Sequence, residues 1–286
     1  MTPHQRTFED QLTTDLHGKL DYATNLGLPQ LLNAQKPLSH PQHHDELLFI
    51  IQHQTSELWM MLVIHELRAA LDHINHDRLS PCFKILARVK QVLRQLFEQW
   101  AVLETLTPTE YMQFRHVLGP ASGFQSAQYR TIEFLLGNKD ARMIKVFAHD
   151  EATSKSLQQD LEQPSLYEAF LAHLDRAGLP IPEHAIKRDF TEPRDIDEQV
   201  LSVFETIYTN PSSHWNAYEM AEKLIDIDEQ LSLWRFRHMK TVERVIGFKR
   251  GTGGSAGVAF LKQVVDLRLF PELWEVRTHL KEQPSQ

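Results

Sequence analysis

The chain is predicted to fold as an all-α helical bundle. Its apolar residues recur at three- and four-residue spacing over most of the 286 positions, which is the period of an amphipathic helix. Convincing strand alternation is absent from the sequence, and no repeat, low-complexity tract or linker divides it. One all-helical domain over residues 1–286 is therefore the economical prediction.

The first three helices are expected at residues 45–73, 81–103 and 107–118. In the first, apolar residues nearly surround the helix, which predicts burial on several sides. The third begins with a threonine–proline start signal. The second carries an apolar stripe at helical spacing, formed by Ile85, Val89, Val92, Leu96, Trp100 and Leu103.

Residues 119–123 follow as a turn or loop, since they are rich in glycine and proline. A fourth helix is expected at residues 124–136, where Gly137 and Asn138 give a good carboxyl-terminal stop signal. A shorter fifth helix at residues 164–176 ends before a turn that contains glycine and proline.

The polar, proline-containing stretch at residues 180–197 is expected to be a surface excursion. A long final helix follows at residues 213–247. Its continuous apolar stripe includes one histidine and is formed by Leu224, Ile227, Leu231, Trp234, His238, Val242 and Val245.

Composition narrows the functional classes. A net charge of −8 argues against a nucleic-acid binder that relies on phosphate neutralisation. The lone cysteine, Cys82, cannot form an internal disulfide and indicates a reducing compartment. The first residues lack the apolar core of a signal peptide, and the longest apolar run, at residues 58–64, is far short of the ~20 residues of a membrane span. A soluble cytoplasmic protein is expected.

Two histidines are predicted to face the interior. Phe49 and His53 lie four apart and share one helix face, which Glu57 extends. An aromatic wall beside an imidazole is a reasonable start on a pocket for a flat, apolar ligand with one polar edge. His238 is the second, on the stripe of the final helix. A lone histidine there is more often a hydrogen-bonded core residue, yet a neutral imidazole facing a pocket is also what axial ligation of haem iron requires.

Other metal sites find less support. Residues 43–46 (His-His-Asp-Glu) resemble a metal cluster by composition only, because adjacent side chains diverge on a helix. His73 and His76 lie three apart, but their polar neighbours suggest a solvated helix end. A di-iron carboxylate bundle needs Glu-x-x-His pairs on two helices, and the sequence contains none.

Two further features point to a polar ligand. Tyr111 and Arg115 lie four apart, and the planar guanidinium suits a carboxylate. The alternative is a surface cation beside a partly buried tyrosine. The glycine-rich residues 251–257 follow a helix rather than a strand and lack the phosphate-loop pattern, so a nucleotide site is disfavoured. They are either a lid that meets a ligand or a mobile connector.

Taken together, these residues resemble the tryptophan 2,3-dioxygenase family. The resembling motifs are long and stand in family order with family-like spacing over most of the chain. They lie at residues 43–59, 111–115, 119–126 and 237–257.

The resemblance implies a helical bundle with a haem pocket between long helices. His238 would be the proximal axial ligand of haem b, with one haem per subunit. His53 would be the distal, catalytic histidine, placed to accept a hydrogen bond from the substrate indole N–H. The implied reaction joins L-tryptophan with O₂ to give N-formyl-L-kynurenine, the first step of the kynurenine pathway.

The implied substrate site has an indole end and a carboxylate end. Phe49 would pack against the indole ring, Arg115 would grip the carboxylate beside Tyr111, and Thr252 would contact the amino acid end as its loop closes. The expected substrate-binding residues are Phe49, Ile50, Ile51, Gln52, His53, Tyr111, Arg115 and Thr252.

The resemblance also implies a homotetramer in which an amino-terminal segment reaches a neighbouring subunit's pocket. Family members often carry two tyrosines there. Tyr22 holds the first position, whereas Asn25 stands at the second, followed by Leu26. Two alternatives are a related haem protein acting on another indole, and a haem carrier without turnover; a carrier would not need the amino acid contacts.

Overall fold

The computed structural model describes Glu9 and residues 11–282, and within these residues it consists of helices and loops without a strand. The all-α prediction is therefore confirmed. The α-helices are α1 (Tyr22–Asn25), α2 (Leu28–Leu31), α3 (Glu46–Asn75), α4 (Leu79–Glu98), α5 (Trp100–Leu103), α6 (Pro108–Phe114), α7 (Ala127–Leu135), α8 (Glu151–Glu162), α9 (Leu166–Arg176), α10 (Glu183–Ile186), α11 (Glu198–Thr209), α12 (Trp215–Ile246), α13 (Val258–Val265) and α14 (Pro271–His279). The 3-10 helices are η1 (Arg115–Leu118), η2 (Gly123–Gln125) and η3 (Ala141–Phe147).

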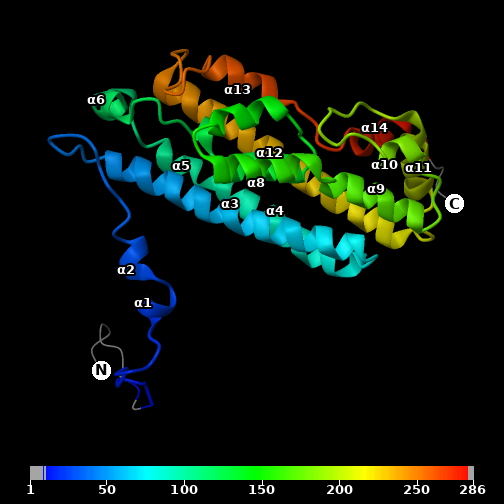
Figure 1. Cartoon of the computed structure of the whole chain (residues 1–286), viewed down its shortest axis with the longest axis horizontal. Helices are drawn as coiled ribbons and strands as arrows, with labels where there is room; N and C mark the ends of the chain where they lie inside the picture. The colour runs from blue at the N-terminus through cyan, green and yellow to red at the C-terminus, as the bar shows by residue number, and fades with distance from the viewer. Residues whose placement is uncertain (1–8, 10, 283–286) are drawn as a thin grey trace.

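Three long helices form the frame, because α4 packs against both α3 and α12 (Figure 1). Lys90 on α4 pairs with Asp226 on α12 at 2.7 Å, and Arg237, further along α12, bonds to Glu104 just after α5. Helices α4 and α12 therefore run in the same direction, while α3 runs opposite to both. The start of α3 and the end of α12 consequently meet at one end of the bundle.

Apolar stripes explain this packing. Helix α4 presents a single strongly amphipathic face to the core, as the sequence predicts. The second half of α3 buries one stripe of side chains, at Val63, Leu67, Ala70 and Ile74. Its first half is more open. Of the described helices, only α3 has the length and apolar composition to cross a membrane, a test that the core helix of a soluble protein also passes.

The stop signals after the fourth and fifth expected helices are confirmed. Gly137 adopts a left-handed φ of 99°, and Asn138 N–H donates to the Glu133 carbonyl, which closes α7. Gly178, with φ 88°, ends α9 in the same way. The expected surface excursion at residues 180–197 is largely exposed. It is attached to the bundle by Arg194, which donates at 2.7 Å to the fully buried Glu272 of α14.

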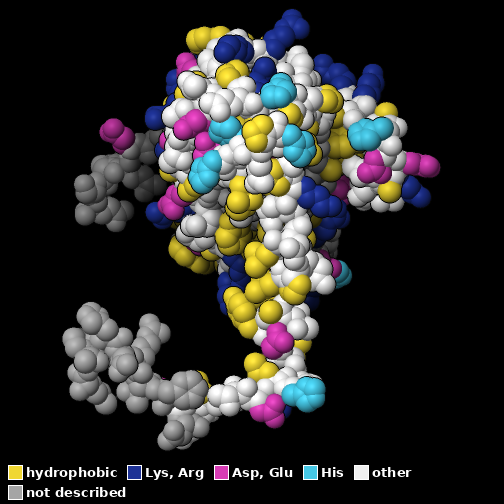
Figure 2. Space-filling model, turned by 90° about the vertical axis from the view of Figure 1, so that its left-hand side faces the viewer, with side chains coloured by type: hydrophobic (Ala, Val, Ile, Leu, Met, Phe, Trp, Pro, Cys, Tyr) yellow, Lys and Arg dark blue, Asp and Glu magenta, His cyan; other side chains and the backbone are white. Residues whose placement is uncertain are grey.

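The amino-terminal arm, residues 11–37, extends away from the bundle (Figure 1). Its two short helices, α1 and α2, contain no buried residue. Apolar side chains are nonetheless frequent along it (Figure 2), and Leu20 and Tyr22 are 70% and 76% exposed. Within the described residues, the arm therefore packs into no hydrophobic core.

Candidate active site

His53 lies on the first half of α3 with one ring nitrogen fixed. Its Nδ1 is 2.7 Å from the carbonyl oxygen of Phe49. A carbonyl can only accept, so Nδ1 carries the proton and Nε2 is left with a free lone pair. Burial lowers the pKa of His53, against the opposing effects of the Phe49 carbonyl and the Glu57 carboxylate. The ring is therefore a neutral acceptor at neutral pH.

An aromatic wall stands beside this imidazole. The Phe49 ring lies 4.2 Å from that of His53, 5.8 Å from Tyr111 and 5.9 Å from Phe114. Tyr111 and Phe114 are buried on α6, whose start is fixed by a capping box between Thr107 and Glu110. The structure thus brings Phe49, His53 and Tyr111 together. Phe114 joins them, although its place in the sequence did not distinguish it from a core residue.

His238 faces the interior from the last third of α12. Its ring stacks on Trp100 of α5 at 4.7 Å and lies 5.7 Å from Trp234, one turn earlier on α12. Burial, with repulsion from His53, lowers the pKa of His238 to about 4. The imidazole is therefore neutral, and the two histidines lie within electrostatic range of each other between α3 and α12.

These side chains fit a haem group. Among the described residues His238 has no hydrogen-bond partner, so its lone pair is available to a metal. The buried indole N–H groups of Trp100 and Trp234 also lack an acceptor within the described chain, and carboxylates such as those of haem would supply one. No cluster of three or more metal-binding side chains occurs in residues 11–282 or at Glu9. A single neutral imidazole suits an iron that arrives in its own macrocycle.

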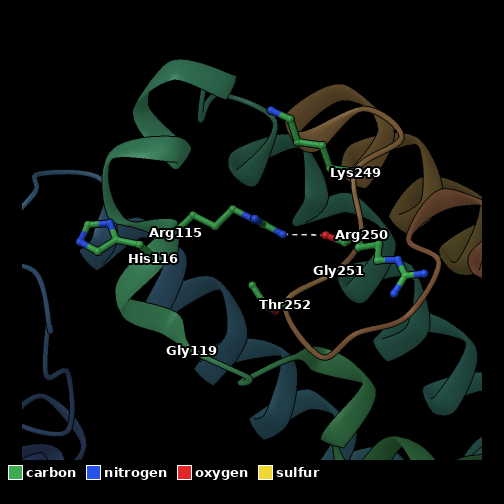
Figure 3. A pocket seen from close by; sticks show the side chains of 7 residues that line it. All are labelled: Arg115, His116, Gly119, Lys249, Arg250, Gly251 and Thr252. Carbon is green, nitrogen blue, oxygen red and sulfur yellow. Dashed lines mark hydrogen bonds between the residues drawn. The ribbon is translucent and has the colours of Figure 1, made fainter.

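The amino acid end of the expected site is a cavity of about 380 Å³ (Figure 3). Arg115 extends into it, and its Nη2 donates to the Arg250 carbonyl oxygen at 2.6 Å. The Nε of Arg115 is buried without a partner among the described residues. Thr252 lies on the facing loop, where its hydroxyl donates to the Ala121 carbonyl oxygen at 2.5 Å. The lining residues are Arg115, His116, Gly119, Lys249, Arg250, Gly251 and Thr252.

The glycine-rich loop is closed over the turn at residues 119–123. A Cβ on Gly253 would lie 2.8 Å from the Ser122 Cβ, and one on Gly257 would lie 2.5 Å from the Lys249 carbonyl oxygen. Gly257 also has a left-handed φ of 62°. This close approach favours the interpretation of the loop as a lid over a ligand. A mobile connector would need no such fit.

The three expected substrate-binding residues between Phe49 and His53 differ in direction. Ile50 and Gln52 lie beside the face that Phe49 and His53 share, whereas Ile51 lies on the opposite side of α3. Ile51 is 44% exposed on the outside of the bundle. Gln52 is buried, with its Nε2 lacking a partner among the described residues. Their contact with substrate remains a prediction.

Several residues that line the site were not among the substrate-binding residues expected from the sequence. Lys249, Arg250 and His116 add positive or titratable groups to the cavity around Arg115. Histidine side chains also gather on this end of the molecule (Figure 2). Trp234 carried a usable signal, because it lies four residues before His238 and so shares its face. Trp100 carried none beyond its place on an apolar stripe.

Comparison with known proteins finds one family. The model of the family described as tryptophan 2,3-dioxygenase matches residues 9–190 and 194–280. A tryptophan 2,3-dioxygenase of Serratia proteamaculans is 59% identical over 277 residues, which cover 97% of this chain and 99% of the relative. One of Myxococcus xanthus is 56% identical over 98% of this chain and 97% of its own. One of Xanthomonas campestris pv. campestris is 59% identical over 96% and 92%.

Proposed function

Because the chain belongs to the tryptophan 2,3-dioxygenase family, we propose that it oxidises L-tryptophan with O₂ to N-formyl-L-kynurenine. This reaction cleaves the indole C2–C3 bond and opens tryptophan catabolism by the kynurenine pathway. Haem b, one per subunit and held through His238, would supply the iron for the chemistry with O₂. The polypeptide supplies orientation, a dry pocket and discrimination between substrates.

The observation that carries the proposal is the tautomer of His53. Its Nδ1–H is committed to the Phe49 carbonyl, so its Nε2 can only accept. An indole N–H can only donate. The pairing is therefore complementary, and the Phe49 ring beside it offers a flat surface for the indole. Since an indole N–H is a very weak acid, His53 acts by holding the substrate in position, without needing to remove the proton.

Arg115 supports recognition of the carboxylate. The Nη2 of its guanidinium donates to the Arg250 carbonyl, and its Nε–H has no acceptor among the described residues. A substrate carboxylate offers two oxygens to this guanidinium, a charge-assisted contact worth roughly 1.5–3 kcal/mol. Thr252 lies on the same cavity and can contact the amino acid end. Both groups meet at this cavity because the loop at residues 251–257 lies over the turn at residues 119–123.

We also propose a cytoplasmic homotetramer built from one all-helical domain per chain. The arm exposes Tyr22 and Leu26, which would lie against the pocket of a neighbouring subunit. The first half of α3 offers a matching apolar surface, exposed at Leu47, Ile51, Leu58 and Met61. Burying both surfaces together would remove apolar area from water in each chain. A lone buried cysteine is consistent with a reducing compartment.

The test is an optical assay on purified, haem-reconstituted protein. Dithionite-reduced protein is mixed with L-tryptophan and then with O₂, while the Soret band and product absorbance are followed together. A Soret band with N-formylkynurenine formation is the expected result. A Soret band without product, even across a panel of substituted indoles, would leave a haem carrier. No Soret band after reconstitution would make His238 an ordinary core histidine.

A further inference from the structure

We propose that Trp100 and Trp234 form an aromatic slot that fixes the ring plane of His238 by packing, with Trp100 stacked on one face of the imidazole and Trp234 beside that pair. Both are thus positioning residues for the haem ligand. The inference rests on the proposed function, because it takes His238 as that ligand.

The slot is defined by three ring pairs. Trp100 lies face to face with the His238 imidazole, with centroids 4.7 Å apart and planes inclined by 10°. Trp234 lies 5.7 Å from the same ring at 30°. The two indoles are themselves 6.1 Å apart, so the three rings form a triangle in which Trp100 covers one face of the imidazole and Trp234 lies beside that pair. Both are buried, so a rotation of the imidazole about its Cβ–Cγ bond would meet one of them.

The described residues give this ring no hydrogen-bond partner. A metal-bound histidine almost always donates its second N–H to a carboxylate, a backbone carbonyl or a water. The other interior histidine, His53, makes such a bond to the Phe49 carbonyl. For His238, no carboxylate or carbonyl of a described residue takes this place. Ring packing is therefore the restraint that the described protein provides.

Trp100 and Trp234 are each held in place by contacts with other helices. Trp100 follows Gln99, whose amide donates to the Ser56 hydroxyl at 2.7 Å and accepts from Thr55, which ties the start of α5 to α3. Trp234 lies 5.2 Å from the Tyr129 ring, and the Tyr129 hydroxyl accepts from Arg235 at 3.1 Å. The slot therefore persists as part of the core, independently of what the imidazole binds.

A slot that orients the imidazole by packing predicts a specific behaviour when the side chain is removed. In His238→Gly protein, free imidazole should stack on Trp100 beside Trp234 and restore haem binding. Its affinity then measures the slot directly. It does so without any contribution from turnover. The measurement is a titration of haem-reconstituted His238→Gly protein with imidazole, followed by the Soret band.

Three second substitutions are compared in this background. Trp100→Leu should weaken imidazole binding by about three- to tenfold, the range expected for loss of one aromatic pair. Trp100→Phe keeps a ring without the N–H and should stay within about twofold of the parent. The matched control is Trp215→Leu, the same substitution at an exposed tryptophan at the far end of α12, and it should change nothing.

The intact ligand gives a second readout. In ferrous protein that retains His238, the iron–histidine stretching band in resonance Raman should broaden with Trp100→Leu and stay narrow with Trp100→Phe. Should Trp100→Leu fail to fold, as judged by circular dichroism, Trp234→Leu removes the neighbouring ring and carries the same test. Equal imidazole affinity in the leucine variants and the parent would overturn the slot. Equal losses for Trp100→Phe and Trp100→Leu would assign the effect to the indole N–H and overturn it as well.

Failure of the proposed function would look different. If His238→Gly protein bound haem without imidazole as firmly as the unaltered protein does, His238 would not be the ligand, and the slot would fall with that assignment. If haem binding depends on imidazole but not on the two indoles, the ligand assignment stands and only the slot is refuted.

Discussion

Replacing Arg115 with methionine should weaken the binding of L-tryptophan, because the contact with the substrate carboxylate is lost and the other contacts remain. The substitution keeps the length of the side chain and removes a guanidinium that lines the cavity. Its Nη2 bonds to the Arg250 carbonyl, and its buried Nε has no partner among the described residues. Loss of a charge-assisted contact of about 1.5–3 kcal/mol corresponds to about a 10- to 150-fold weaker Kd. The assay is the perturbation of the haem spectrum by L-tryptophan and by tryptamine, which lacks the carboxylate.

The two ligands separate recognition from general damage. Binding of tryptamine should change by less than about threefold, since it has no carboxylate to lose. Arg142→Met is the matched control, because Arg142 lies on the surface with its side chain 82% exposed. Equal losses for L-tryptophan and tryptamine in Arg115→Met would refute the reasoning, and so would an unchanged Kd for L-tryptophan.

Four further outcomes are expected. His53→Ala should lower turnover and weaken indole binding while haem content, measured by the pyridine haemochrome, stays unchanged. His238→Ala should abolish stable haem binding, and a variant with full haem content would contradict the assignment. Burial lowers the pKa of His53, so the ring stays neutral as the pH falls through 6.5, the ordinary pKa of histidine. We therefore expect kcat/KM to stay constant between pH 8 and about pH 6.5 and to fall only below that range. A fall centred above pH 7 would count against a neutral acceptor. Gly257→Ala should raise KM for L-tryptophan because its Cβ meets the Lys249 carbonyl, whereas Gly254→Ala, in open space at a similar φ, should have a smaller effect.

Local sequence accounts for the elements with strong periodicity. Helices α3, α9 and α12 lie close to the ranges expected from apolar spacing and stop signals. Helix α8 has no counterpart among the expected helices, because only Leu157 and Leu161 give it an apolar face. The break between α4 and α5 was missed as well. Gln99 there is held by Ser56 and Thr55, partners some forty residues away, which local spacing cannot reveal.

The same distinction applies to the site. Phe49 with His53, and Tyr111 with Arg115, are pairs four apart on helices, so their proximity could be predicted from spacing. The bond from Arg115 to the Arg250 carbonyl joins positions 135 residues apart. The stacking of Trp100 on His238 is equally distant in sequence. Such contacts are set by the packing of α4 against α12 and become visible only in the fold.

As a dioxygenase, this protein is expected to insert both atoms of O₂ into L-tryptophan. The most direct measurement is a single turnover of reduced, haem-loaded protein with L-tryptophan under ¹⁸O₂, followed by mass spectrometry of the product. We expect N-formylkynurenine carrying both labelled oxygens. Product with one labelled oxygen, or with none, would contradict the proposed reaction.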